Sequence, residues 1–126
     1  MRTATLILPA TVLGALLMLT TGCETETVGT KSFMGSYTSM VDSTPDKVTK
    51  AAAKAADELK LTNIQSTATK VDGKVTAKTA QSDDVTINIE QAGENVSKVS
   101  IRVGATGDEA TSKMILQKIK DNLHWF

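Results

Sequence analysis

The segment from Leu61 to Val103 constrains the fold most, because its apolar and polar residues alternate with a period of two. Successive side chains of a β-strand point to opposite faces, so this alternation predicts strands with one buried face. Turn-forming residues interrupt it at Asp72-Gly73, at 82–84 and at 92–95. A two-residue Asp-Gly link is typical of a type I′ hairpin turn, which predicts strands over 61–71 and 74–80. The segment is therefore expected to form four antiparallel strands joined by hairpins.

A helix is predicted before this segment. Thr44 is suited to an N-cap and Pro45 to the first helical position, and the helix should run to about Leu59 or Lys60. Its apolar stripe is rich in small residues and consists of Val48, Ala52, Ala55 and Leu59. Upstream, residues 33–41 alternate and predict a first strand, although the pattern leaves its inward face open.

A second helix is predicted after the four strands. Thr106 and Glu109 have the spacing of a capping box, so we expect Thr106 at the N-cap and a helix to about Leu123. Its buried stripe would contain Ser112, Leu116, Ile119 and Leu123. The predicted fold class is therefore α+β: an antiparallel sheet of about five strands, in the order strand-helix-four strands-helix, with two helices packed on one face.

Residues 1–22 differ from the rest of the chain. Arg2 precedes an apolar stretch from Leu6 to Leu19, and small residues follow it. This arrangement is typical of a secretory signal peptide, and the stretch is shorter than the ~20 residues that a permanent membrane helix needs. We expect residues 1–22 to be a signal peptide that is cleaved between Gly22 and Cys23.

The sequence Thr20-Thr21-Gly22-Cys23 resembles the lipobox of bacterial lipoproteins. The resemblance implies that the Cys23 thiol receives a diacylglyceryl group, that the peptide is cut before it, and that acyl chains hold the protein on a membrane. The usual pattern has Leu where this chain has Thr20, which leaves ordinary cleavage with an unmodified Cys23 as the alternative. Glu24, in place of the Asp that signals inner-membrane retention, favours the outer membrane over the inner. Residues 23–32 would then be a lipidated tether and 33–126 a single α+β domain.

The most specific pattern in the domain runs from Asn95 through Gly104 and continues from Gly107 to Ala110 and on to Leu116. With the order of lipobox, strand, Ala-rich helix and meander, it resembles the small bacterial lipoproteins of the family called domain of unknown function 3568. The resemblance covers about residues 33 to 123 and implies no activity, cofactor or partner. In fold alone, the layout is also similar to the helix-grip domains of BamC-type envelope lipoproteins.

Composition argues against several function classes. The 14 basic and 14 acidic residues give a formal net charge of zero, so no positive field attracts nucleic acid. Cys23 is the only cysteine, which excludes an intramolecular disulfide and a cysteine-based zinc site. His124 is the only histidine, and it would need a partner such as Asp121 to act as a catalytic base. The simpler interpretation is that His124 complements the negative end of the second helix.

Two further motifs have a chemical and a structural interpretation. Asp83-Asp84 with Glu90 or Glu94 could bind a cation, but no loop with alternating carboxylates is present, and turn residues are the better explanation. Residues 104–107 precede a helix as a phosphate-binding loop does, but Asp108 follows where a lysine is needed. The terminal Trp125 and Phe126 would either cover the core or form a contact patch.

We therefore expect a non-enzymatic protein of the bacterial cell envelope, lipid-anchored through Cys23 and facing the periplasm. Its domain would present its sheet or its helices to an envelope protein, without cofactor, metal or nucleic acid. The alternative is a periplasmic carrier that holds a small apolar ligand between the Ala-rich helix and the sheet. A hydrolase that depends on His124 is the third hypothesis.

Overall fold

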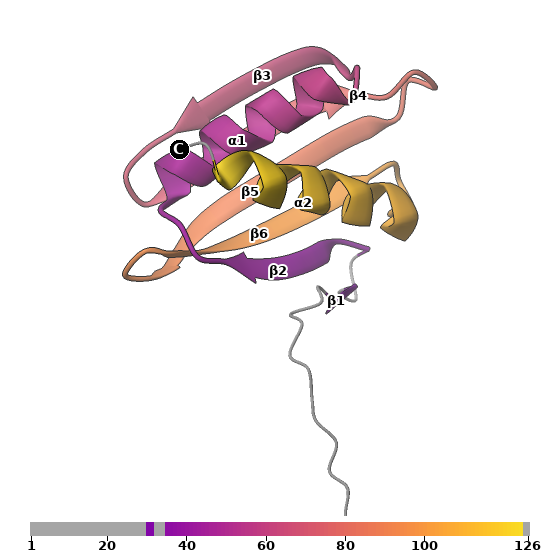
Figure 1. Cartoon of the computed structure of the whole chain (residues 1–126). Coiled ribbons are helices and arrows are strands. Elements are labelled where there is room, and N and C mark those ends of the chain that lie inside the picture. The colour runs from indigo at the N-terminus through magenta and orange to yellow at the C-terminus, as the bar shows by residue number, and fades with distance from the viewer. Residues whose placement is uncertain (1–29, 32–34, 125–126) are drawn as a thin grey trace, which may run out of the picture.

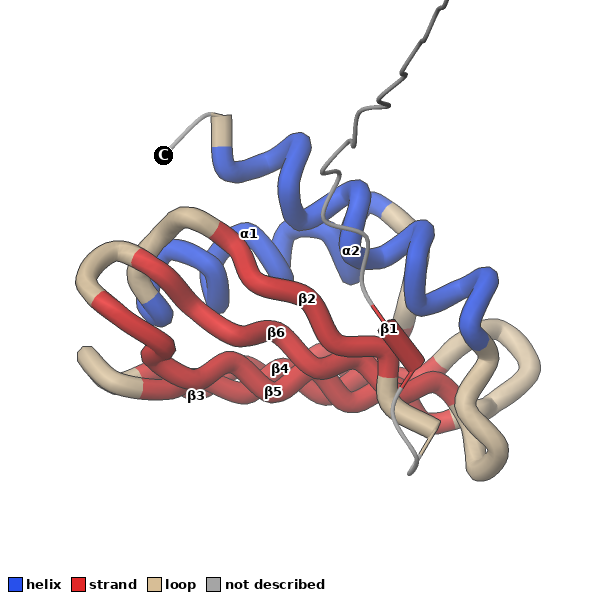
Figure 2. Tube along the Cα trace, turned by 90° about the horizontal axis from the view of Figure 1, so that it is seen from below, coloured by secondary structure: helices blue, strands red, loops and turns tan. Residues whose placement is uncertain are grey.

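The computed structural model of the chain describes residues 30–31 and 35–124. The elements, in chain order, are β1 (Thr30–Lys31), β2 (Tyr37–Val41), α1 (Pro45–Glu58), β3 (Thr62–Ala68), β4 (Asp72–Lys78), β5 (Asp84–Gly93), β6 (Val96–Val103) and α2 (Glu109–Leu123). All strands belong to one antiparallel sheet in the order β1-β2-β6-β5-β4-β3 (Figure 1). Figure 2 shows that both helices lie on the same face of this sheet. The predicted α+β fold is confirmed, with the two-residue β1 added to five longer strands.

The core lies between the helices and the central strands. The alternating apolar residues of β5 and β6 face each other in register, and Ile87, paired with Ile101, is fully buried. Residues of both helices close the core from the other side; the buried ones include Val48, Ala51, Ala52, Ala55, Ile115, Leu116 and Ile119. Since alanine has a short side chain, α1 can lie close to the sheet, as its small-residue stripe predicts.

The start of α1 matches the sequence prediction. Thr44 is the N-cap and Pro45 is the first helical residue. The Thr44 hydroxyl does not cap the helix but donates a hydrogen bond to Asp46 Oδ1, 2.7 Å away. This hydrogen bond is the main cause of a lowered pKa of the exposed Asp46 carboxyl group. The carboxylate thus stays charged beside the positive end of the helix.

The first long strand is shorter than predicted. The prediction covered 33–41, whereas β2 begins at Tyr37; residues 32–34 lie outside the described residues. Tyr37, Ser39 and Val41 are buried, so these residues form the inward face that the pattern left open. On the other face, the Thr38 and Ser100 hydroxyl groups lie 3.1 Å apart and join β2 to β6.

The turn between β3 and β4 corrects a sequence prediction. Asp72 and Gly73 do not form the turn but lie inside β4, and the turn consists of residues 69–71. The Thr69 hydroxyl oxygen accepts hydrogen bonds from the backbone N–H groups of Val71 and Asp72, both at 3.1 Å. The Thr69 side chain thus stabilises a turn at residues 69–71, three residues before the predicted one, by accepting hydrogen bonds from those backbone N–H groups.

Gly73 is instead required by the packing of α1. A Cβ atom at Gly73 would overlap the Thr49 hydroxyl oxygen and lie 3.0 Å from Thr49 Cβ. The Thr49 hydroxyl is itself held, because it donates to the Pro45 carbonyl oxygen at 2.7 Å. The helix therefore approaches β4 so closely that only glycine fits beneath it.

The beginning of α2 also differs from the prediction. The N-cap is Asp108, not Thr106, and the Asp108 carboxylate accepts a hydrogen bond from the Thr111 backbone N–H at 3.2 Å. Gly107 has a φ of +79°, and a Cβ there would lie 2.9 Å from the carbonyl carbon of Gly35. Because the chain turns through residues 104–107 against Gly35, the helix begins two residues later than a capping box at Thr106 requires.

Gly73→Ala is expected to lower the free energy of unfolding by about 1–3 kcal/mol, because the added methyl group forces Thr49 or α1 to move. Urea denaturation of the full chain measures this change. Gly93→Ala is the matched control: its Cβ would lie 3.8 Å from Val96 Cβ, an ordinary contact. We expect that control to change stability by no more than about 0.5 kcal/mol. Equal effects of the two substitutions would contradict the assignment of Gly73 to helix packing.

Asp108→Ala is expected to lower the free energy of unfolding by about 1 kcal/mol, because the Thr111 N–H loses its acceptor. Thr106→Ala serves as the comparison and should change stability by no more than about 0.5 kcal/mol. Thermal or urea unfolding of both variants ranks the two residues. A larger loss of unfolding free energy in Thr106→Ala than in Asp108→Ala would contradict Asp108 as the N-cap and support the capping box predicted at Thr106.

Candidate functional site

The face of the sheet opposite the helices is open (Figure 2). Because side chains alternate along a strand, the residues between the buried ones point to this face. They are polar apart from the exposed Met40, and are Thr38, Met40, Gln65, Thr67, Asp72, Lys74, Thr76, Lys78, Asp84, Thr86, Asn88, Glu90, Lys98, Ser100 and Arg102. The candidate functional site is this open face, defined by these residues.

The strand register arranges the open face in rows. One row crosses five strands and consists of Thr67, Lys74, Asn88, Ser100 and Thr38. The next row consists of Gln65, Thr76, Thr86 and Arg102. Hydroxyl and amide groups dominate both rows, so the face offers many hydrogen-bond donors and acceptors at regular spacing.

Charged pairs lie at the two ends of the open face. At one end Glu90 stands opposite Lys98 and Asp72 in the register. At the other end Lys78 Nζ lies 2.7 Å from Asp84 Oδ1. The Lys78–Asp84 pair is largely exposed, so it contributes little to stability. Its charges therefore remain accessible to a polar partner.

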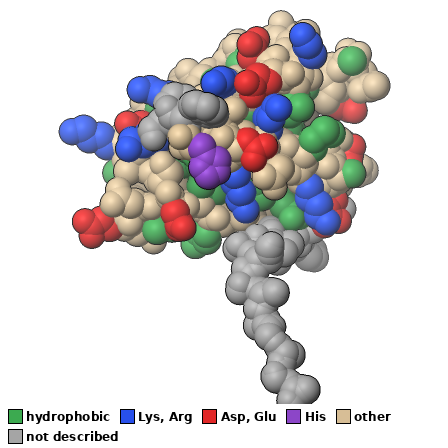
Figure 3. Space-filling model, in the orientation of Figure 1, with side chains coloured by type: hydrophobic (Ala, Val, Ile, Leu, Met, Phe, Trp, Pro, Cys, Tyr) green, Lys and Arg blue, Asp and Glu red, His purple; other side chains and the backbone are tan. Residues whose placement is uncertain are grey.

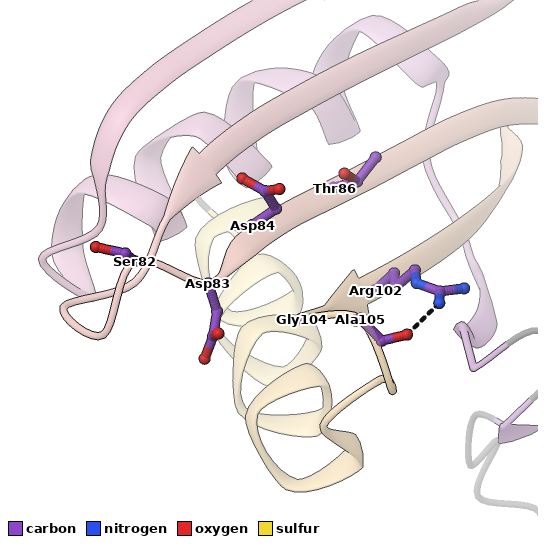
Figure 4. Close-up of a pocket in the computed structure, with 7 residues that line it drawn as sticks. All are labelled: Ser82, Asp83, Asp84, Thr86, Arg102, Gly104 and Ala105. Atoms are coloured by element: carbon purple, nitrogen blue, oxygen red, sulfur yellow. Dashed lines mark hydrogen bonds between the residues drawn. The ribbon is translucent and has the colours of Figure 1, made fainter.

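A polar depression lies beside the Lys78–Asp84 end. Its volume is about 440 Å³, and its lining residues, shown in Figure 4, are Ser82, Asp83, Asp84, Thr86, Arg102, Gly104 and Ala105. Arg102 donates a hydrogen bond to the Ala105 carbonyl oxygen. The carboxylates of Asp83 and Asp84 point in different directions (Figure 4). They do not converge on one point, which a cation site with two carboxylate ligands would require.

The metal hypothesis finds no support in the described part of the chain. Within residues 30–31 and 35–124, no group of three or more His, Cys, Asp and Glu side chains could hold a metal ion. Asp83 and Asp84 border the turn before β5, and Glu94 lies in the turn between β5 and β6. The predicted turn roles fit Asp83 and Glu94, whereas Asp84 begins β5 and Glu90 lies inside it.

His124 lies at the C-cap of α2 and is exposed; it is the purple side chain in Figure 3. The carboxylate of Asp121, the partner that a catalytic histidine would need, accepts a hydrogen bond from Gln117 Nε2 at 3.0 Å. Lys and Arg side chains are mixed with Asp and Glu across the helix face of Figure 3. The surroundings of His124 are thus those of a solvated helix end.

The glycine loop before α2 packs against the chain's own backbone. Gly107 lies against Gly35, as described above, and the Asp108 carboxylate occupies the helix N-terminus by accepting from Thr111 N and Oγ1. An anion would meet this carboxylate where a phosphate-binding loop presents free N–H groups. The loop is therefore structural.

The lipidation site lies outside the described residues. Gly22 and Cys23 fall before residue 30, and Trp125 and Phe126 fall after residue 124. Neither α1 nor α2, the helices in the described part of the chain, is long and apolar enough to cross a membrane.

The described residues define a small two-layer α+β domain with one sheet face covered by helices and one face open. A family model described as "Protein of unknown function (DUF3568)" matches residues 6–122. The match spans nearly the whole chain, so the chain belongs to this family, as the sequence resemblance predicted. No curated protein matches the chain.

The sequence alone leaves undecided which face of the sheet is exposed. The alternation along residues 85–90 and 97–102 already separates Thr86, Asn88, Ser100 and Arg102 from the buried residues. The predicted turn at Asp72-Gly73 would pair Thr67 with Lys78 instead of Lys74, which changes the rows across the sheet but leaves each residue on the same face. The Thr69 side chain, suited to a turn, was the signal for the correct register.

Proposed function

We propose that this protein is a lipid-anchored envelope lipoprotein whose domain binds another envelope component, without catalysis, through the open face of its sheet. The observation that carries the binding role is the asymmetry of the sheet. One face is covered by α1 and α2, whereas the other presents hydrogen-bonding side chains in register across five strands. A rigid sheet that holds such groups at fixed spacing is suited to a polar partner surface.

The lipid anchor is supported by the lipobox-like segment before Cys23 and by the extent of the family match. That match begins at residue 6, so the apolar stretch and Cys23 lie inside the pattern of the family. Two or three acyl chains would make membrane attachment stable, whereas one is marginal. The domain would then face the periplasm, and Glu24 favours the outer membrane.

The packing between α1 and the sheet favours this proposal over a carrier of apolar ligands. Ala51, Ala52 and Ala55 are fully buried, and Thr49 lies directly over Gly73. The space that the small residues of α1 could have left for a ligand is taken up by the close approach of the helix itself. A polar, open surface is therefore the stronger candidate for binding.

The anchor is tested by the intact mass of the protein extracted from its native membranes. We expect residues 23–126 plus acyl chains, because the thiol and the new amine of Cys23 would both be acylated. Cys23→Ser should abolish the added mass and release the chain from the membrane fraction. An unmodified mass for residues 23–126 in the native protein would contradict the anchor and make the protein a secreted domain with a free thiol.

The binding face is tested by a photo-crosslinking residue placed in the living cell at Asn88, an exposed position in the middle of the open face. We expect a crosslinked adduct with an envelope component, because Asn88 lies within the proposed interface. Lys54, exposed on α1, is the matched control for the helix face and should give no such adduct. Adducts from Lys54 and none from Asn88 would contradict binding through the open face and indicate binding through the helices.

A further inference from the structure

The two edges of the sheet differ in the length of their outermost strand. At one edge, β1 pairs with β2, with Thr30 opposite Thr38 and Lys31 opposite Tyr37. At the other edge, β3 pairs only with β4 within the described chain, and its outer side is open in Figure 1. Six of its seven residues are exposed. A sheet edge of this kind presents unpaired backbone N–H and C=O groups to which another strand can bind.

The hydrogen-bond pattern shows which backbone groups of β3 face outward. The Thr69 N–H donates to the Asp72 carbonyl oxygen at 2.8 Å, so Thr69 and Asp72 are a hydrogen-bonded pair. In an antiparallel ladder such pairs alternate with non-hydrogen-bonded ones, so Thr67, opposite Lys74, also bonds to β4. Ser66 and Ala68 therefore turn their N–H and C=O groups away from β4 and toward the open edge.

The second half of β3 lacks the features that protect a sheet edge. Natural edge strands are commonly blocked by charged side chains or proline, and from Leu61 to Thr69 there is neither. A bulge between Thr62 and Gln65, where Asn63 has a φ of 52°, disturbs the first half of the strand. The regular and unprotected part is Gln65–Ala68, and it contains both outward-facing residues.

We propose that β3 pairs antiparallel with β3 of a second copy of this chain, with Thr67 of each copy on a two-fold axis. In this register Ser66 of one copy pairs with Ala68 of the other, so both outward-facing residues in each copy gain partners. Lys70 stands opposite Ile64 and not opposite another lysine. The two sheets then continue into one, and β1 lies at both outer edges.

Charge favours a second copy as the occupant. An uncharged strand has no complementary charge to offer a charged partner strand, whereas two uncharged strands pair without repulsion. The formal net charge of the chain is zero, so two copies approach each other without long-range repulsion. The contact involves few residues, so the dimer is expected to be weak in solution; confinement to a membrane would raise its effective concentration.

The first test replaces Ala68 by proline. Ala68→Pro removes the outward N–H but no hydrogen bond to β4, and proline is tolerated at such edge positions. We expect the dissociation constant of the dimer to rise by about tenfold or more, because the backbone hydrogen bonds that the Ala68 N–H donates across the interface are lost. A tenfold rise corresponds to about 1.4 kcal/mol of binding free energy. The urea midpoint should stay close to that of the unsubstituted chain. Ala68→Ser, which keeps the N–H, is the matched control and should dimerise as the unsubstituted chain does.

The second test uses the symmetry of the pairing. Thr67→Lys and Thr67→Glu each place like charges opposite one another on the axis and should each weaken the dimer, whereas a one-to-one mixture of the two variants should restore it. Thr67→Cys should form a disulfide-linked dimer, because a non-hydrogen-bonded pair brings the Cα atoms to about 4.5 Å. The unsubstituted chain, with Cys23 alone, controls for any other disulfide.

Sedimentation velocity of the full chain in mild detergent, over a concentration series, measures all these variants. A dimer that Ala68→Pro weakens and that the charge pair restores supports the proposal. A chain that stays monomeric at all concentrations would overturn it, and so would a dimer that is indifferent to Ala68→Pro. If β3 instead binds a strand of a different protein, the chain by itself would stay monomeric in this experiment, and that result would likewise overturn the proposal.

Discussion

The close approach of α1 to β4 is the contact on which the rest of the structure depends. Thr49 lies over Gly73, and the alanine stripe of the helix is fully buried beside it. Because alanine and glycine carry so little side chain, this layer is held by close backbone packing and not by large side chains. The aromatic content of 3% is consistent with such a core.

The buried polar groups of the two helices are hydrogen-bonded around this contact. Thr49 donates to the Pro45 carbonyl oxygen, and Asn122 of α2 donates to the Ala51 carbonyl oxygen of α1 at 3.3 Å. Ser97 of β6 donates to the Ser43 carbonyl oxygen at 2.7 Å and so fixes the entry to α1. A buried polar group without a partner would cost stability, so these bonds define one position for each helix.

The position of the helices leaves the molecule with an open face and an open edge. Both helices lie on one side of the sheet, so its polar side is uncovered, and β1 pairs with β2 at one edge. The free edge at β3 lies at the opposite end of the strand order from β1.

The alternation of residues 85–90 and 97–103 and the helical stripes of α1 and α2 determined the elements and the fold class by themselves, because burial of one face imposes a strong period on the sequence. The family followed from the resemblance of residues 95–116 to its members, which the family match bears out. The turn at residues 69–71 and the N-cap at Asp108 were decided by tertiary structure. Gly73 suits both a turn and a close contact, and only the position of α1 selects the contact. The rows of the open face depended on that choice, because a change of register alters which residues stand side by side across the strands.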